Sequence, residues 1–218
     1  MNCLTFMPRK KTILNVEFPS HISARCVNKE WFHIPLPQVW TIMSDYLFFI
    51  HHAYEIRIFS FVLMRNHFHM IASNPKGNMS QAMNYFMRET SKRIGEGSGR
   101  INQVYGGPYH KTRIDSNHYF QTAYKYVYRN PVEAGLTKAP ENYPYSTLYG
   151  ILGKGALEIP VVEDTFLFDN PSNHISWLNR KYSEEDRASI QEALRRAVFR
   201  FPKDRTTRRP HRLENHLA

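Results

Sequence analysis

The sequence of 218 residues has few features of a secreted or membrane protein. Its two cysteines, Cys3 and Cys26, are too few for a disulfide framework or a zinc quartet. No apolar run approaches the ~20 residues of a membrane-spanning helix, and the most apolar stretch, 59–64, has strand length. Glu17 follows the basic start at 9–11 too closely for a secretory signal peptide. These absences predict a cytoplasmic protein.

Acidic residues are scarce. The chain has 29 Lys and Arg against 19 Asp and Glu, a net charge of +10. Residues 1–150 hold 17 basic and 9 acidic side chains, residues 151–194 hold 4 and 8, and residues 195–218 hold 8 and 2. Excess positive charge in the main body and at the C-terminal end favours a polyanionic partner such as nucleic acid.

The chain has no internal repeat, and its hydrophobic pattern changes period along its length. Period-two alternation and β-branched content predict strands at 20–28, 54–64, 67–73 and 109–114. Apolar stripes at helical spacing predict helices at 39–52, 79–94 and from a cap at Ser116 to Asn130, before Pro131. This order is typical of an α+β, ferredoxin-like antiparallel sheet with helices on one face.

The pattern weakens after residue 150. We therefore predict one domain over 1–150, a mainly helical C-terminal extension over 151–202, and a basic tail over 203–218. The extension should contain an amphipathic helix near 183–199, because Ser183 is a suitable N-cap. The tail has little apolar content, so we expect it to be disordered without a partner.

The segment His67-Phe68-His69 places two histidines two residues apart in a predicted strand. Both imidazoles then leave the same face of the sheet, about 7 Å apart. Two aligned imidazoles form half of a divalent metal site, and a pair of surface histidines is the structural alternative. An oxygen ligand is needed to complete a site for a hard cation.

The predicted helix before Pro131 is rich in tyrosine. Tyr126 and Asn130 lie one turn apart on the same face. A tyrosine hydroxyl can attack a phosphodiester when a metal ion polarises the phosphate, and the Asn130 amide oxygen is a candidate third ligand. The alternative is a tyrosine-rich helix that packs into a core.

Two segments carry a resemblance to a known family. Residues 61–71, which contain Asn66-His67-Phe68-His69, resemble the HUH motif of single-tyrosine transposases. Residues 126–136, with Asn130-Pro131-Val132-Glu133-Ala134-Gly135-Leu136, resemble the family segment that carries the nucleophilic tyrosine. The likeness covers about residues 10–150, and the longer chain looks most like the REP-associated tyrosine transposases. Arg65 departs from the proline that is commoner before the Asn-His pair.

The resemblance implies the HUH nuclease fold and a set of site residues. His67, His69 and Asn130 would bind Mg²⁺ or Mn²⁺, and Tyr126 would be the catalytic nucleophile. The implied enzyme is a transposase that cleaves and rejoins single-stranded or hairpin DNA through a covalent 5′-phosphotyrosine. Such an enzyme would be nucleoid-associated in a bacterial cytoplasm, as a monomer or homodimer.

Two other functions remain open. The chain could be a domesticated protein that binds hairpin DNA or RNA without cleavage, or a metal hydrolase in which Tyr126 only packs. DNA would be bound by basic side chains on phosphates, and we select those in the second predicted helix, the last strand and the tail. The candidate contacts are Arg88, Lys92, Arg93, Lys111, Arg113, Arg205, Arg208 and Arg209.

Overall fold

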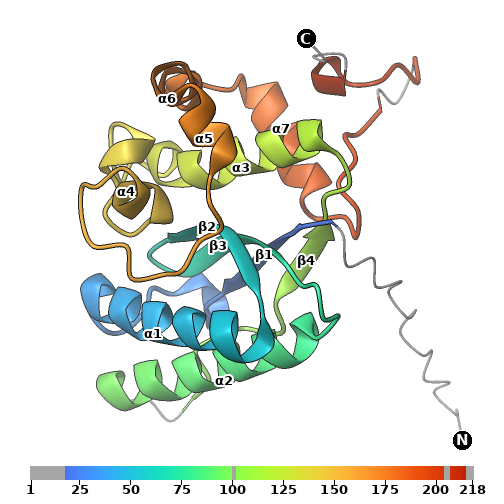
Figure 1. Cartoon of the computed structure of the whole chain (residues 1–218). Coiled ribbons are helices and arrows are strands. Elements are labelled where there is room, and N and C mark those ends of the chain that lie inside the picture. Colours follow the sequence, from blue (N-terminus) through green and yellow to red (C-terminus); the bar gives the residue numbers. More distant parts are fainter. Residues whose placement is uncertain (1–17, 100–101, 204–206, 215–218) are drawn as a thin grey trace, which may run out of the picture.

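The computed structural model describes residues 18–99, 102–203 and 207–214. Four strands form one antiparallel sheet in the order β2-β3-β1-β4. Helices lie on both sides of it, with α1 and α2 on one side and α3 to α7 on the other (Figure 1). The strands are β1 (Ser20–Arg25), β2 (Arg57–Leu63), β3 (His67–Ser73) and β4 (His110–Arg113). The α+β class and the antiparallel sheet are as predicted.

Alternation along β3 directs its side chains to two different cores. Phe68, Met70 and Ala72 are fully buried in the core beneath α1 (Leu36–Tyr54) and α2 (Met79–Ser98). Ile71 belongs to the second core, on the opposite face. The bounds of β3 match the predicted strand 67–73. Helix α1 runs to Tyr54, so β2 begins at Arg57 and not at the predicted residue 54.

The placement of α3 (Asn117–Glu133) corrects the prediction of helices on one face. Ala123 and Val127 of α3 pack with Val62 and Ile71 in the second core. A sheet with apolar side chains on both faces requires cover on both, and α1 and α2 already occupy the first. The Oγ of Ser116 accepts a hydrogen bond from the Tyr119 N–H at 3.1 Å, which confirms the predicted cap.

The end of α3 also differs from the prediction, because Pro131 lies inside the helix. The helix continues to Glu133. After it, the Leu136 N–H donates to the Pro131 oxygen at 2.8 Å and caps the C-terminal end. Gly135 makes this closure at φ 67°, a conformation that glycine adopts without strain. The Asn-Pro pair therefore falls in the last turn of the helix instead of after it.

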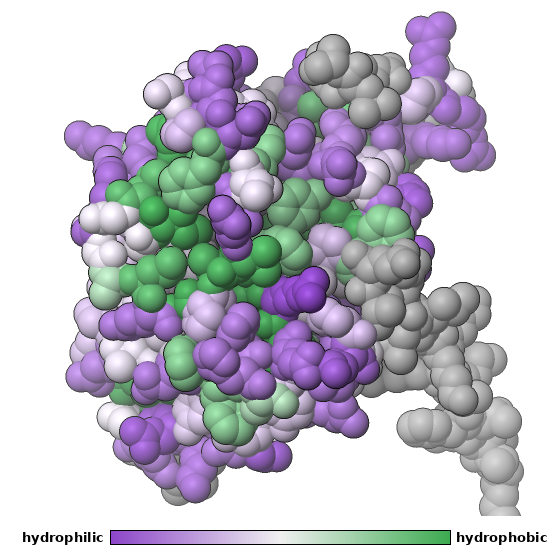
Figure 2. Space-filling view, viewed as in Figure 1, coloured by the Kyte–Doolittle hydropathy of each residue, from purple (hydrophilic) through white to green (hydrophobic). Residues whose placement is uncertain are grey.

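The C-terminal extension packs on the α3 side. It contains α4 (Thr147–Ile151), α5 (Thr165–Asp169), α6 (Pro171–Asn179) and α7 (Glu184–Ala193). It supplies Leu167, Leu178 and Ile190 to the second core. In Figure 2, apolar surface gathers between the two helical layers, whereas the surface over α1 and α2 is mostly polar.

The extension also covers the outer strands of the sheet. The Val162 N–H donates to the Ile58 oxygen of β2 at 2.8 Å. On the opposite edge, the Phe199 N–H donates to the Arg113 oxygen of β4 at 2.8 Å. Helix α7 therefore ends at Ala193, short of the predicted residue 199, because the chain after it extends along β4. Covered edges have fewer free main-chain groups with which to pair a second sheet.

Part of the basic tail is placed on the domain, in contrast to the predicted disorder. Arg212 bonds Asp186 through Nε at 2.8 Å, and Tyr119 donates its hydroxyl to Glu214 at 2.8 Å. Leu213 packs against the second core. A few specific contacts thus compensate for the low apolar content of this segment. Residues 204–206 and 215–218 lie outside the described part of the chain.

No helix in the described ranges is long and apolar enough to cross a membrane.

A buried arginine joins α3 to the extension. Arg129 is 2% exposed, and its guanidinium donates to the Glu133 carboxylate at 2.7 Å. It also donates to the main-chain oxygens of Leu178 at 3.0 Å and Asn179 at 2.8 Å, at the end of α6. We expect Arg129→Met to lower the free energy of unfolding by about 3 kcal/mol, since it removes the donor to two main-chain oxygens and leaves Glu133 with Arg187 alone, at 3.6 Å.

The matched control is another arginine paired with a glutamate four residues away. Arg196 bonds Glu192 at 2.6 Å, but its side chain is 41% exposed. Arg196→Met should cost less than about 1 kcal/mol, because water solvates both partners. Urea unfolding of both variants measures the difference. Equal losses would show that Arg129 does not anchor α3.

Candidate active site

Three histidines meet on the sheet face that α3 covers. His67 and His69 leave β3 on this face, with their ring centroids 4.9 Å apart. Because β1 pairs with β3, His21 lies beside them, and its Nε2 is 2.8 Å from His69 Nδ1. His21 and His69 are buried, and His67 is half-buried. The structure thus brings the predicted pair together and adds a third imidazole.

Hydrogen bonds fix which ring nitrogens can bind a ligand. The Asn66 amide donates Nδ2 to the Lys29 oxygen at 2.6 Å, which turns its Oδ1 toward His67 Nδ1 at 2.7 Å. His67 Nδ1 must then carry the proton, and Nε2 keeps a free lone pair. If His69 donates from Nδ1 to His21, its Nε2 is free as well. His21 Nδ1 is buried without a hydrogen-bond partner among the described residues.

Burial keeps all three imidazoles neutral. It lowers the pKa of His21 to about 3, with smaller effects from the charges of His110 and His67. It likewise lowers the pKa of His67 to about 3, helped by nearby Arg25, and holds that of His69 well below 6.5. Neutral imidazole is the form that binds metal ions, so the cluster is ready to act as a ligand at physiological pH.

Tyr126 lies against this cluster. Its ring centroid is 5.7 Å from that of His69 and 6.4 Å from that of His21, in both cases edge to face. The side chain is half-buried at the boundary of the second core. Tyr126 and the histidines therefore lie together within one chain.

The surroundings of the Tyr126 hydroxyl include the C-terminal extension. Burial raises its pKa, whereas hydrogen bonds with the side chains of Gln191 and Asn130 lower it. The charges of Arg187 and Arg195 also lower the pKa. Gln191 and Arg187 lie on α7, and Arg195 follows it. The C-terminal extension therefore contributes to the electrostatic surroundings of the hydroxyl.

The other tyrosines of α3 point elsewhere. Tyr124 and Tyr128 are 1% exposed, and burial raises the pKa of both. Their hydroxyls, and that of Tyr119, are bonded to groups away from the histidines: Tyr119 to Glu214, Tyr124 to Asp164 and Tyr128 to Thr147. Tyr126 is thus the tyrosine of this helix whose ring contacts the histidines.

Asn130 lies one turn after Tyr126, as the spacing predicts. Its Nδ2 donates to the Tyr126 main-chain oxygen at 2.8 Å, which leaves Oδ1 as the available acceptor. No group of three or more His, Cys, Asp or Glu in the described ranges is arranged to hold a metal ion. A site on His67 and His69 would therefore need an amide or substrate oxygen to complete it, since hard cations require oxygen ligands.

Most predicted DNA contacts lie away from this cluster. Arg88, Lys92 and Arg93 are exposed on α2, the helix that covers the opposite face of the sheet. Lys111 is half-buried on β4, and burial lowers its pKa. Arg113 is 3.8 Å from Asp115 and part of an ion-pair cluster. The first three were selected as exposed charges on a predicted helix, and such charges do not indicate which face of the sheet the helix covers.

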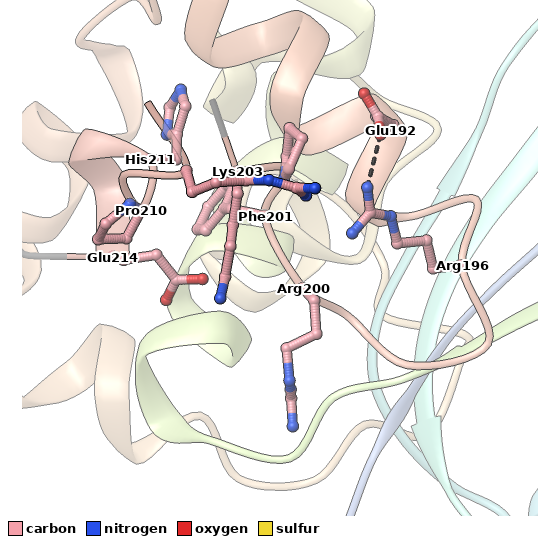
Figure 3. A pocket seen from close by; sticks show the side chains of 10 residues that line it. Glu192, Arg196, Arg200, Phe201, Lys203, Pro210, His211 and Glu214 are labelled. Atoms are coloured by element: carbon pink, nitrogen blue, oxygen red, sulfur yellow. Dashed lines mark hydrogen bonds and ion pairs between the residues drawn. The ribbon is translucent and has the colours of Figure 1, made fainter. Parts of the chain in front are cut away.

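The tail residues surround a basic cavity. Arg205 lies outside the described residues, while Arg208 and Arg209 are exposed. Arg208 helps to line a cavity of about 480 Å³ beneath the tail, into which Lys203 extends (Figure 3). The labelled Arg200 turns away from this cavity, toward Asp115, which it bonds at 2.6 Å. The cavity has an excess of cationic groups, with these lining residues: Glu192, Arg196, Arg200, Phe201, Pro202, Lys203, Arg208, Pro210, His211 and Glu214.

Sequence reasoning missed His21 and Gln191. His21 alternates with Ile22 in a predicted strand, so its place on the face opposite to Ile22 could have been expected. That β1 is the neighbour of β3 could not, because pairing is set by tertiary topology. Gln191 is an ordinary position of an amphipathic helix, and no local signal marks it.

Comparisons with known proteins give a family match and a similar fold. Residues 38–130 match the family described as "Transposase IS200 like". The chain resembles a solved structure of a REP-associated tyrosine transposase bound to a REP hairpin, with a TM-score of 0.56 and 17% identity over 72% of this chain and 93% of that one. At this identity the likeness shows a shared fold. The curated proteins contain no match.

The buried imidazole predicts a pH-dependent stability. Folded protein keeps His21 neutral down to about pH 3, whereas the unfolded chain binds a proton near 6.5. The contribution of His21 to the free energy of unfolding is therefore fully present above pH 6.5. It is lost as the pH falls, by up to about 1.4 kcal/mol per pH unit. His21→Gln should make this dependence shallower. Urea unfolding at pH 7, 6 and 5 with chelator present measures it.

The control is His52→Gln, because His52 is exposed at the end of α1. This variant should keep the pH dependence of stability that the unaltered protein has. The same dependence in both variants would contradict the account of a neutral, buried His21.

Proposed function

We propose that this chain, whose residues 38–130 match the family of IS200-like transposases, cleaves and rejoins single-stranded DNA through a covalent bond to Tyr126. The observation that carries the proposal is the contact of Tyr126 with His69, at 5.7 Å between ring centroids, while its neighbours on α3 bond elsewhere. A tyrosine that served only packing would have no need of a cluster of neutral imidazoles.

The proposed reaction is a transesterification. The Tyr126 oxygen attacks the phosphorus and releases its proton, and the bond from phosphorus to the 3′ oxygen breaks. The products are a 5′-phosphotyrosine and a free 3′-OH, and attack by a second 3′-OH reverses the step. One phosphodiester replaces another, so no nucleotide cofactor is consumed. Gln191 and Asn130 orient the hydroxyl, and Arg187 and Arg195 oppose the negative charge that develops on the phosphate.

A divalent cation fits this proposal. His67 and His69 would hold Mg²⁺ or Mn²⁺ through Nε2, with the Asn130 amide oxygen as a third ligand. When bound, such an ion polarises phosphate oxygens and stabilises the charge of the transition state. Asn66 and His21 act behind the ligands, because each fixes the orientation and tautomer of one imidazole.

The DNA target is proposed to be a hairpin with a single-stranded flank. The similar solved structure is of a protein bound to a REP hairpin. The net charge of +10 and the cationic groups near Tyr126 and around the tail cavity support a polyanionic partner. The exposed Arg208 and Arg209 are proposed to contact the DNA backbone.

The first test replaces the nucleophile. Tyr126→Phe removes one oxygen from a half-buried ring, so the fold should persist and the covalent adduct should vanish. The substrate is a hairpin oligonucleotide labelled at its 3′ end, because the tyrosine retains the 5′ phosphate. Adduct is scored as label that stays with denatured protein on a gel.

The matched control is Tyr128→Phe, two positions along the same helix. Tyr128 is 1% exposed and bonds Thr147 at 2.9 Å, so this variant should lose about 1–3 kcal/mol of stability and still form adduct. Adduct formed by Tyr126→Phe at the normal rate would remove Tyr126 from the mechanism. Hairpin binding without adduct by the unaltered chain would favour the binding-protein alternative.

The second test concerns the metal ion. His67→Ala removes one proposed ligand, so Mn²⁺ affinity should fall at least tenfold and the adduct should be lost. Calorimetric titration with Mn²⁺ in the absence of DNA reports binding independently of activity. His52→Ala, on the opposite side of the sheet, should leave both unchanged. An undiminished adduct yield in excess chelator would contradict the metal-assisted reaction.

A further inference from the structure

A surface loop is fastened to the turn that precedes His67. The Phe32 N–H donates to the Arg65 oxygen at 2.9 Å, and the Asn66 amide donates to the Lys29 oxygen at 2.6 Å. Asn66 also holds His67, so one amide connects the loop to the candidate metal ligand. The loop therefore keeps a fixed position relative to the histidines.

This loop carries a tryptophan on its outer side. Phe32 and Ile34 are 7% exposed and face the first core, whereas Trp31, directly before Phe32, is 62% exposed. Asn28 and Lys29 adopt left-handed φ values of 54° and 60°, which non-glycine residues rarely do. Strain of this kind is kept where the surrounding structure enforces a particular shape, and here the shape leaves an indole in solvent.

The exposed indole is part of a cationic surface. The Arg65 guanidinium carbon lies 4.7 Å from the Trp31 ring centroid. Arg25 is exposed opposite His67 in the pairing of β1 with β3, and Lys29 is exposed in the loop. Glu30 is nearby, with its carboxylate 3.1 Å from His33. Aromatic surface among cations is the composition of single-stranded nucleic acid sites.

We propose that Trp31 and Arg65 form a stacking site for an unpaired base of the single-stranded DNA whose backbone passes His67. The proposal rests on the proposed function, since it places a base near the phosphate that reacts. Stacking on an indole accepts any base, because each base has an aromatic face. Arg25 and Lys29 would contact the adjoining phosphates, and the site would fix the strand with respect to Tyr126.

A second protein copy fits this surface less well. It has one large aromatic ring among three cations, while stable protein interfaces bury an extended apolar centre and are depleted in charge there. Like charges on two copies would also repel each other. The chemistry of the surface therefore favours an anionic polymer with aromatic bases.

The test combines protein variants with abasic DNA. Trp31→Ala should weaken binding of a hairpin with a single-stranded flank by roughly 5- to 100-fold, and Trp31→Phe should restore most of it. Phe168→Ala is the matched control, because Phe168 is also exposed, at 52%, but lies on α5. It should bind DNA like the unaltered chain. Circular dichroism checks that each variant is folded.

The abasic series identifies the base that stacks. Each flank nucleotide in turn is replaced by an abasic unit, and affinity is measured for the unaltered chain and Trp31→Ala. At one position, the abasic unit should weaken DNA binding by the unaltered chain about as much as Trp31→Ala weakens binding of intact DNA. At this position Trp31→Ala should show no further loss, because the two changes remove the same contact.

Three results would overturn the stacking site. These are equal affinities for Trp31→Ala and Phe168→Ala, additive losses at every abasic position, and a dimer in solution that Trp31→Ala dissociates. The outcome is separable from the proposed cleavage. If the base and Trp31 are coupled but the unaltered chain forms no adduct, the stacking site stands and only the cleavage reaction fails.

Discussion

The candidate site depends on the packing of α3 across one face of the sheet. Tyr126 reaches the histidines only because Ala123 and Val127 on the same helix are buried against β2 and β3. Arg129 then fastens the helix to the end of α6 through two main-chain oxygens, while Glu133 of the same helix pairs with its charge. A buried cation is costly to desolvate, so it confers position more than stability. The geometry of the tyrosine is thus set by contacts outside the motif that contains it.

The C-terminal extension completes the domain. It fills the second core, lies along β2 and β4, and brings Gln191 and Arg187 to the tyrosine hydroxyl. The family match ends at residue 130, so these elements lie beyond the matched segment. The surroundings of the candidate residues, which the sequence motifs indicate, thus come in part from a segment that no motif marks.

Local signals predicted much of this structure. Strand alternation gave the bounds of β3 and the common face of His67 and His69, and side-chain chemistry gave the Ser116 cap. The second layer of helices was missed, because a fully buried sheet and a half-buried one differ only in the polarity of alternate residues. His21, Gln191 and the docking of Arg212 on Asp186 depend on contacts between distant segments, which no short pattern contains. The predicted helix end before Pro131 was wrong, because proline is tolerated in the last turn, where the Leu136 N–H donates to the Pro131 oxygen.

The most direct test of the central claim is to locate the protein–DNA bond by mass spectrometry. The adduct is trapped, the DNA is trimmed with nuclease and the protein is cut with trypsin. Cleavage after Lys125 and Arg129 releases a peptide of residues 126–129, which contains both Tyr126 and Tyr128. Fragmentation should place a phosphonucleotide on Tyr126. Attachment to Tyr128, or to any residue outside this peptide, would contradict the site described for this protein.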